Sequence, residues 1–425
     1  MFGAITYRRP INLVLAVDIL AFILLLLYSK EDNWKIAVIS VMLITLILIV
    51  YFAIIKKNIG DEYLFLIVAM LISLGFIMIC RLDPDLGFKQ MEWLILGVAT
   101  FFVSYYVFIK VKTWDVYQFH YILISIAIYL VTLIFGRSIK GATNWIIIGG
   151  FSFQTSEMVK ILYIFFLASF YKNSNLITEN TVLRKFSIIP QNIERKLFLM
   201  LITFVNLGFL VLQREWGTVV LLMILYFITL YISGSSYKFI ILNALPSASA
   251  LFLGYEFLAH IRIRVETWLN PWTDISGKGY QITQSLFAIS AGGFFGTGIG
   301  MGKPDLIPVA DTDFIFSAIC EEMGIFGGVA IVLLFLILSY RGFKIAMSIS
   351  DTFYKFIALS ITAMFGFQTF IIIGGVIKFI PMTGITLPFI SYGGSSLLTS
   401  FITLGILQAI SKISSDGERS LVEDE

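Results

Sequence analysis

Long apolar runs recur along almost the whole chain, and short charged or Gly- and Pro-rich segments separate them. A bilayer core about 30 Å thick needs roughly 20 apolar residues per helical span. The pattern predicts an all-α polytopic membrane protein with about twelve transmembrane helices. The expected spans lie near residues 11–28, 36–55, 63–80, 91–109, 119–136, 158–171, 196–213, 217–233, 238–258, 314–339, 356–376 and 392–411.

Composition agrees with a membrane protein. Hydrophobic residues make up 58% of the chain, charged residues make up 13%, and the mean hydropathy is +0.92. A soluble globule is usually about half apolar, so no soluble domain of useful size is expected. The net charge of +3 is scattered over short loops, which argues against nucleic acid as a partner. Cys80 and Cys320 lie far apart in sequence and are interpreted as packing residues.

Basic residues gather in alternate loops. An even number of spans places both termini on one side, and the positive-inside rule makes that side cytoplasmic. The residues assigned to it are Arg8, Arg9, Lys56, Lys57, Lys110, Lys112, Lys172, Arg184, Lys185, Arg195, Lys196, Lys238, Arg341, Lys344 and Lys355. The loops 137–157, 214–216, 259–313 and 377–391 are then outside, where any chemistry is expected. The polar tail 412–425 is expected to be cytoplasmic and disordered.

Segment 141–160 carries the first polar motif. Ser156 is predicted to cap the following helix, and Glu157 and Lys160 are spaced to pair on one helix face. Ionisable groups near lipid usually face the bundle interior or a wet cavity. A structural ion pair at the membrane interface and a functional pair in a cavity are equal alternatives.

A second polar motif, residues 213–218, lies between two apolar runs. Its three polar residues and Trp216 are typical of an interfacial anchor. Arg214 offers the alternative of binding an anionic phosphate group, which suits guanidinium geometry.

The long loop 259–313 is dense in groups useful for chemistry. Its charged side chains include Arg262, Arg264, Asp274 and Lys278. Asp274 has basic residues on both sides in sequence, and the flanking Trp and Pro residues could shield it from water, which favours a general base. Most loop aspartates are solvated surface residues, so the residues alone leave the role of Asp274 open.

Three further segments follow. The stretch 282–300 contains five glycines and is predicted to form a re-entrant or interfacial helix. Glu321 and Glu322 lie in an apolar helix, and at least one is expected to face the bundle interior. Segment 381–396, rich in Gly, Pro and Ser, has either a cavity-lining or a structural role.

Missing motifs narrow the chemistry. A P-loop, a His-Glu-x-x-His pair and a Gly-x-Ser-x-Gly elbow are all absent from the sequence, which disfavours ATP hydrolysis, zinc proteolysis and elbow-type esterase activity. Because His120 and His260 are the only histidines, a metal would be held by oxygen ligands, as Mg²⁺ or Mn²⁺ prefers.

Several motifs in order resemble the SEDS family, the RodA, FtsW and SpoVE proteins of bacterial elongation, division and sporulation. They are Gly-Ala-x-x-Trp-Ile with Gln154, Ser156, Glu157 and Lys160; Gly279-Tyr280-Gln281; Thr312 to Phe316 with Glu321, Glu322 and Gly324; and Pro-x-Thr-Gly through Gly-Gly-Ser-Ser in 381–396. The resemblance covers about residues 120–411 and implies ten core spans preceded by two extra helices. The division is 1–118 for the N-terminal spans, 119–411 for the catalytic core and 412–425 for the tail.

The resemblance implies a peptidoglycan glycosyltransferase of the bacterial cytoplasmic membrane, which polymerises lipid II on the outer face beside a class B penicillin-binding protein. The family's essential aspartate corresponds to Asp274, as the base that deprotonates the acceptor hydroxyl while undecaprenyl pyrophosphate departs with inversion. Candidate substrate- and pyrophosphate-binding residues are Trp145, Glu157, Lys160, Arg214, Arg262, Arg264, Lys278, Gln281, Asp313, Ser395 and Ser396. A departing diphosphate requires cations, and a divalent ion, with Asp274 as its candidate ligand, could share the task.

The sequence departs from the family pattern at several positions. Arg214 and Glu215 stand where many members have Pro and Asp, Asp311 takes a position often held by His, Gln or Asn, and Ile372 and Lys378 replace the usual Asn and Gly. A divergent subgroup is expected, with elongation, division and sporulation undistinguished. Two rival functions stay open, namely a lipid II flippase, which does not need Asp274 as a base, and a non-catalytic scaffold, which tolerates loss of loop charges.

Overall fold

The computed structural model describes residues 10–28, 33–139, 142–148, 151–173 and 191–423. Of the residues assigned above to the cytoplasmic side, Arg8, Arg9, Arg184 and Lys185 lie outside these ranges. The elements are α1 (Ile11–Tyr28), α2 (Asn33–Lys57), α3 (Glu62–Leu82), α4 (Pro84–Lys110), η1 (Trp114–Tyr117), α5 (Gln118–Phe135), β1 (Arg137–Ile139), β2 (Ala142–Ile148), β3 (Phe151–Gln154), α6 (Thr155–Lys172), α8 (Gln191–Leu212), α9 (Trp216–Ile232), α10 (Tyr237–Phe257), α11 (Ala259–Leu269), η3 (Pro271–Asp274), α12 (Tyr280–Gly292), η4 (Pro304–Leu306), α13 (Ile315–Ser348), α14 (Thr352–Val376) and α15 (Gly394–Glu423).

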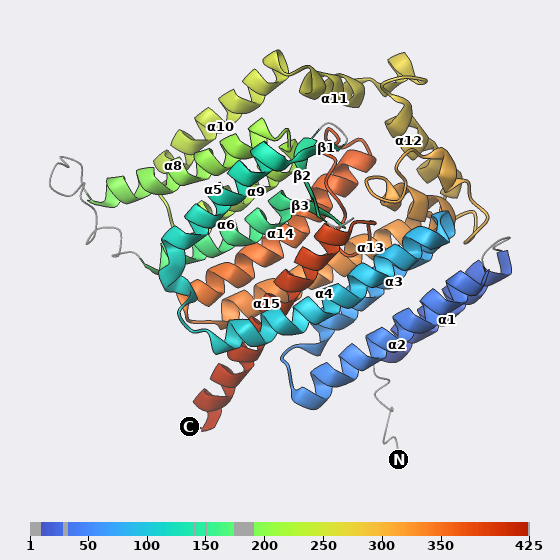
Figure 1. Ribbon diagram of the computed structural model, residues 1–425, viewed down its shortest axis with the longest axis horizontal. Coiled ribbons are helices and arrows are strands. Elements are labelled where there is room, and N and C mark those ends of the chain that lie inside the picture. The colour runs from blue at the N-terminus through green and yellow to red at the C-terminus, as the bar shows by residue number, and fades with distance from the viewer. Residues whose placement is uncertain (1–9, 29–32, 140–141, 149–150, 174–190, 424–425) are drawn as a thin grey trace.

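The long helices run side by side as one bundle, with the sheet, α11 and α12 at one end, called here the loop end (Figure 1). Every predicted span coincides with a helix. In the described ranges, ten helices are long and apolar enough to cross a membrane. Helix α9 has 17 residues, and α6 carries three charged residues, so neither is among the ten. The α-helical polytopic architecture is confirmed, and the count of twelve spans stays a prediction.

Aspartates fix the starts of three long helices. Asp61, Asp83 and Asp351 accept hydrogen bonds from backbone N–H groups at the starts of α3, α4 and α14. Each carboxylate satisfies a donor that has no partner within the helix. The predicted cap at Ser156 is wrong, because α6 already begins at Thr155 and its N-cap residue makes no side-chain cap bond.

Helices α3 and α14 form the centre of the bundle. Within their spanning windows 89% and 83% of residues are buried, against 22% for α10. Small residues allow other helices to approach closely. In the α4–α15 contact, a side chain at Gly97 would collide with the ring of Phe401, and one at Gly405 would collide with the backbone of Phe101. This contact holds the start of α15 beside Trp93 of α4.

A three-stranded antiparallel sheet of order β1-β2-β3 was not predicted, because segment 137–157 was interpreted as a loop. Trp145 is paired with Gln154 and Ile146 with Phe153. The sequence does contain a hairpin signal, since β-branched and aromatic residues stand on both sides of a Gly-Gly pair. The signal was overlooked because a short segment between long apolar helices is usually interpreted as a loop.

The predicted loop 259–313 is largely helical, with α11, η3, α12 and η4 in succession. Helix α12 has 13 residues, which is too short to cross a bilayer core. Its end and the following turn contain Gly293, Gly296, Gly298 and Gly300, all with positive φ. Helix α12 thus covers the first part of this glycine-rich stretch, and a re-entrant or interfacial position of the helix stays a prediction.

Two buried glutamates of α13 anchor the turn after α12. Glu322 pairs with Arg81 of α3 at 3.0 Å and accepts a hydrogen bond from the N–H of Gly300. Glu321 accepts a hydrogen bond from the N–H of Lys303 at 2.7 Å. Both side chains face the interior, as expected for at least one of them.

The prediction of a disordered tail from residue 412 is wrong for most of that segment. Helix α15 continues to Glu423, and Lys412 pairs with Asp416 one turn later at 2.7 Å. An i,i+4 pair of this kind supports an exposed helix. The tail therefore extends the last span as a helix beyond the end of the bundle opposite the loop end (Figure 1).

Candidate functional site

A polar cavity of about 370 Å³ opens at the loop end, where segments far apart in the sequence meet. The sheet, the turn before α9, helix α11, the segment before α13 and the segment before α15 all contribute to its wall. Seven of the candidate residues named from the sequence line it, namely Trp145, Glu157, Arg214, Arg264, Asp313, Ser395 and Ser396. The outer segments 137–157, 214–218 and 381–396 therefore meet at one cavity.

The sheet fixes one wall of the cavity. The N–H of Thr143 donates to the carbonyl of Gln213 at 3.1 Å, which joins the sheet to the turn between α8 and α9. From the sheet, the amides of Asn144 and Gln154 both donate to Oε1 of Glu215. Burial raises the pKa of Glu215, and the neighbouring charge of Glu157 adds to this rise. The wall thus holds a buried carboxyl group that is stabilised mainly by neutral donors.

A buried ion pair on α6 lies at the bottom of the cavity, where Glu157 lines the wall and Lys160 lies beneath it. Glu157 and Lys160 lie 2.9 Å apart, as the i,i+3 spacing predicts, and their residues are 7% and 4% exposed. Glu157 also accepts a hydrogen bond from Thr399 of α15, and Lys160 donates to Gln368 of α14. The pair therefore joins three helices beneath the cavity.

Arginines supply positive charge at the rim. Arg264 of α11 donates to the carbonyls of Met382 and Thr383 at 3.2 and 2.9 Å, which ties the long loop to the segment before α15. Arg214 lies in the turn before α9 with a φ of 61°. Burial, together with the charges of Arg214 and Arg264, lowers the pKa of His260. At neutral pH the two arginines, and not the histidine, supply the charge.

Asp274 does not line the cavity. It ends η3, between α11 and α12, and its carboxylate is exposed and accepts a hydrogen bond from the N–H of Lys278 at 3.0 Å. The predicted shielding from water is wrong, because Trp272 is 48% exposed. A side chain at Gly277 would collide with both carboxylate oxygens. The turn therefore orients Asp274 closely while leaving it open to solvent.

Four other candidates lie off the cavity wall. Lys160 sits beneath the floor, and Arg262, Lys278 and Gln281 are exposed on the long loop. Arg262 is turned back toward α10, where it pairs with Glu256 at 3.7 Å. The structure thus separates the arginines of α11, since Arg264 reaches the cavity and Arg262 does not.

Sequence reasoning missed several wall residues. Trp93, Asn144, Gln154, Glu215, Asp311, Thr386 and Tyr392 line the cavity and were not proposed as site residues. The motifs did contain Gln154 and Glu215, so the signal was present. No motif pointed to Trp93, because it lines the cavity only as a result of the close contact between α4 and α15.

The described residues do not form a metal site from protein ligands alone. Within the described ranges, no three or more His, Cys, Asp or Glu side chains are grouped to hold a metal ion. Mg²⁺ is often held by one or two carboxylates together with substrate phosphates. The residues present therefore fit a metal only as a partner of bound phosphate.

Comparison with known proteins places the chain among related membrane proteins. Residues 61–416 match the model of the FtsW, RodA and SpoVE family, described as "Cell cycle protein". The match begins just before α3, earlier than residue 120, and leaves α1 and α2 outside. The peptidoglycan glycosyltransferase RodA of Mycobacterium tuberculosis is 36% identical over 369 residues, covering 83% of this chain and 78% of that protein. Stage V sporulation protein E of Bacillus subtilis is 33% identical over 84% of this chain and 99% of that protein.

Solved structures share the fold. One, described as "Structural coordination of polymerization and crosslinking by a peptidoglycan synthase complex", matches with a TM-score of 0.68 at 24% identity, over 84% of this chain and 98% of that one. RodA of Thermus thermophilus matches with a TM-score of 0.60 at 22% identity, over 83% and 96%. On the family match and the sequence identity together, the chain belongs to the FtsW, RodA and SpoVE family.

Proposed function

We propose that this protein polymerises lipid II into glycan strands, with the polar cavity as the donor site and Asp274 as the base. The enzyme class, a peptidoglycan glycosyltransferase, follows from the family and from relatives of that name that align with 83% of the chain. The observation that supports the donor site best is the polar cavity at the loop end, with Arg214 and Arg264 in its wall.

The two arginines suit a departing diphosphate. A guanidinium group offers a fork of N–H donors that matches phosphate oxygens, and preformed charge stabilises the negative charge that develops on a leaving group. Arg264 is held in place by its two carbonyl partners, so it needs little reorganisation when substrate binds. The donor's pyrophosphate therefore lies between the 213–218 turn and α11, with its sugar toward Ser395 and Ser396.

Asp274 takes one proton in the proposed reaction. The 4-hydroxyl oxygen of the acceptor attacks the anomeric carbon of the donor as its proton passes to the carboxylate. The anomeric C–O bond breaks, and its electron pair leaves with undecaprenyl pyrophosphate. One displacement inverts the anomeric centre and needs one base and no covalent intermediate. Because Asp274 is on the η3 turn outside the cavity, the acceptor must lie across the cavity mouth.

The remaining assignments are part of the same proposal. The loop end faces outward from the bacterial cytoplasmic membrane and both termini are cytoplasmic, because the basic loops lie at the other end. The structural match to a peptidoglycan synthase complex supports a cross-linking partner, proposed as a class B penicillin-binding protein. A Mg²⁺ or Mn²⁺ ion would be held mainly by substrate phosphate oxygens and would neutralise charge on the diphosphate, because Asp274, the carboxylate suggested from the sequence, lies outside the cavity.

The test compares two aspartates of the long loop. Asp274→Asn and Asp305→Asn each remove one exposed carboxylate, and only Asp274 is assigned to the reaction. Purified protein, alone and with its partner, is supplied with lipid II and Mg²⁺ or Mn²⁺, and glycan chains are measured by gel electrophoresis. We expect a loss of at least about a hundredfold for Asp274→Asn and wild-type rates for Asp305→Asn.

The rival functions predict other outcomes. A flippase moves lipid II across vesicles without forming glycan, and Asp274→Asn leaves this movement intact. A scaffold forms no glycan and moves no lipid II, but still activates the partner. Glycan synthesis by Asp274→Asn at the wild-type rate would remove Asp274 from the mechanism.

A further inference from the structure

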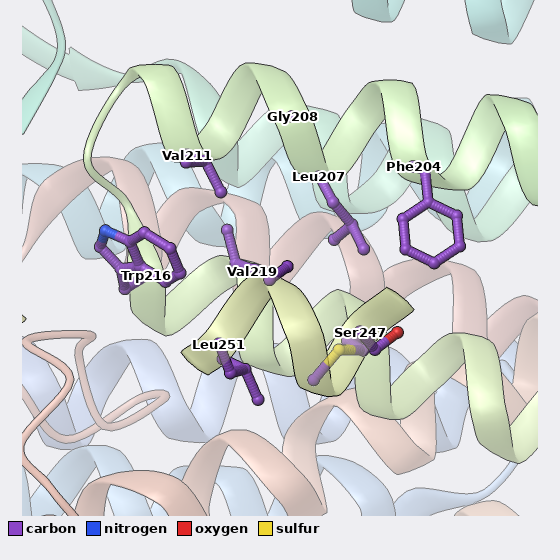
Figure 2. Close-up of a pocket in the computed structure, with 10 residues that line it drawn as sticks. Phe204, Leu207, Gly208, Val211, Trp216, Val219, Ser247 and Leu251 are labelled. Atoms are coloured by element: carbon purple, nitrogen blue, oxygen red, sulfur yellow. The ribbon is translucent and has the colours of Figure 1, made fainter. Parts of the chain in front are cut away.

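An apolar groove lies next to the polar cavity, between α8, α9 and α10. It has a volume of about 280 Å³, and apolar side chains form nearly all of its wall. Figure 2 shows Phe204, Leu207 and Val211 directed into it from α8, and Val219 of α9 and Leu251 of α10 also line it. The two small residues Gly208 and Ala250 are exposed and leave the groove open at the side. In a membrane, this opening meets lipid.

The head of the groove adjoins the proposed donor site. Trp216 lines the groove, and the next two residues, Gly217 and Thr218, line the polar cavity. Arg214, the proposed diphosphate ligand, is two residues before Trp216. From there the groove follows α8 back from Val211 to Phe204, which is about 10 Å along the helix axis. A molecule with its phosphate at Arg214 therefore has an apolar channel beside it that runs along α8 away from the loop end.

An unused hydrogen-bond donor marks the junction. The indole Nε1 of Trp216 is buried and has no hydrogen-bond partner in the part of the chain that the structure describes. Buried indole N–H groups usually find an acceptor. A phosphate ester oxygen at the junction would supply one, because it links an anionic head to an apolar chain.

We propose that this groove binds the first isoprene units of the donor's polyprenyl chain, next to the diphosphate. This inference rests on the proposed function, because it places the diphosphate at Arg214. If a group of one heavy atom with its hydrogens occupies about 30 Å³, the groove volume of about 280 Å³ holds roughly nine such groups. This is close to the ten carbon atoms of two isoprene units. The rest of the chain stays in the bilayer.

The groove acts by orientation. Lipid chains are as apolar as the groove wall, so moving a prenyl chain from bilayer to groove has little hydrophobic driving force. What the groove adds is direction: with the first units held along α8, the diphosphate and its sugar enter the cavity in one orientation. Filling the groove is therefore expected to weaken productive binding several-fold without abolishing the chemical step.

Two alanines of α10 give a matched pair of variants. Ala250 lines the groove, whereas Ala248 is exposed elsewhere on the same helix. Ala250→Leu fills the groove, and Ala248→Leu adds the same side chain to the lipid-facing surface. We expect Ala250→Leu to raise the KM for lipid II roughly fivefold, equivalent to about 1 kcal/mol, with kcat nearly unchanged. Ala248→Leu is expected to match the wild type.

Cross-linking gives a measurement that does not depend on turnover. Lipid II with a diazirine in its second isoprene unit is photolysed with the Asp274→Asn protein in bilayers, and labelled peptides are identified by mass spectrometry. We expect labels on 204–211 of α8 and 247–251 of α10, and their loss in Ala250→Leu. A phospholipid with a diazirine in its acyl chain, used in parallel, is expected to label these peptides much less.

The outcomes separate this inference from the proposed function. Unchanged KM for Ala250→Leu, labels on other helices, or equal labelling by the phospholipid would each overturn the groove assignment and leave the glycosyltransferase intact. Groove labelling by a wild-type protein that forms no glycan would support the groove and reject the polymerase.

Discussion

The buried pair beneath the cavity gives the sharpest stability prediction. Lys160→Met keeps most of the side-chain volume and removes the charge that faces Glu157 at 2.9 Å. Glu157 is 7% exposed and would keep one hydroxyl partner, Thr399. Breaking a buried pair from one side typically costs about 3–5 kcal/mol, because the remaining charge is left uncompensated.

The single and double variants respond in opposite ways. We expect Lys160→Met to lower the free energy of unfolding by about 3 kcal/mol. Glu157→Gln/Lys160→Met removes both charges and is expected to recover most of this loss, because replacing a whole buried pair is often nearly neutral. For a chain of this length, 3 kcal/mol corresponds to a fall in Tm of roughly 3 °C or more.

Thermal unfolding in lipid nanodiscs measures the difference. The single variants, the double variant and the wild type form a double-mutant cycle. A control pair, Lys412→Met and Asp416→Asn, tests the exposed pair on α15, where the coupling is expected to be below about 1 kcal/mol. If Lys160→Met is as stable as the double variant, the buried pair does not hold α6, α14 and α15 together as argued.

Three other substitutions test separate features. Gly277→Ala pushes against the Asp274 carboxylate and is expected to lower kcat on the order of tenfold with unchanged Tm, measured by glycan synthesis and thermal unfolding. Lys378→Gly relieves a left-handed residue with φ 62° and is expected to raise stability by about 1 kcal/mol in a denaturation series. Burial raises the pKa of Glu215 in the folded protein. The contribution of this carboxyl group to stability therefore falls as the pH rises above the pKa that it has in the unfolded chain. Glu215→Gln does not titrate, and its advantage in Tm over the wild type is expected to grow from pH 5 to pH 8; a constant difference would contradict this.

The sequence predicted the bundle and much of the cavity for a physical reason. A span must be apolar for about 20 residues, so the loops that separate spans are easy to locate and alternate between the two sides. Segments 137–157, 214–218 and 381–396 were thereby placed on one side before any contact was known. The Glu157–Lys160 pair was also predictable, because three-residue spacing brings two side chains together within one helix.

Other features depend on contacts that spacing does not encode. The exposure of Asp274 follows from its place on the η3 turn, and the ring of the flanking Trp272 lies against Phe287 of α12 at 5.9 Å. Trp93 reaches the cavity only because glycines bring α4 and α15 together. The sheet was missed because its strands are short and stand next to long apolar helices, where a helix or a loop is the default expectation.

Two residues with a left-handed backbone stand at positions where the sequence departs from the family pattern described above. Arg214 has φ 61° at the position that the family resemblance matches to proline, and Lys378 has φ 62° at the position that it matches to glycine. Proline cannot adopt a positive φ, whereas glycine adopts it freely. Restoring the common residue would therefore damage the turn at 214 and relax it at 378. Consensus engineering of this protein must be decided by backbone geometry at each position, because these two departures from the family pattern call for opposite treatment.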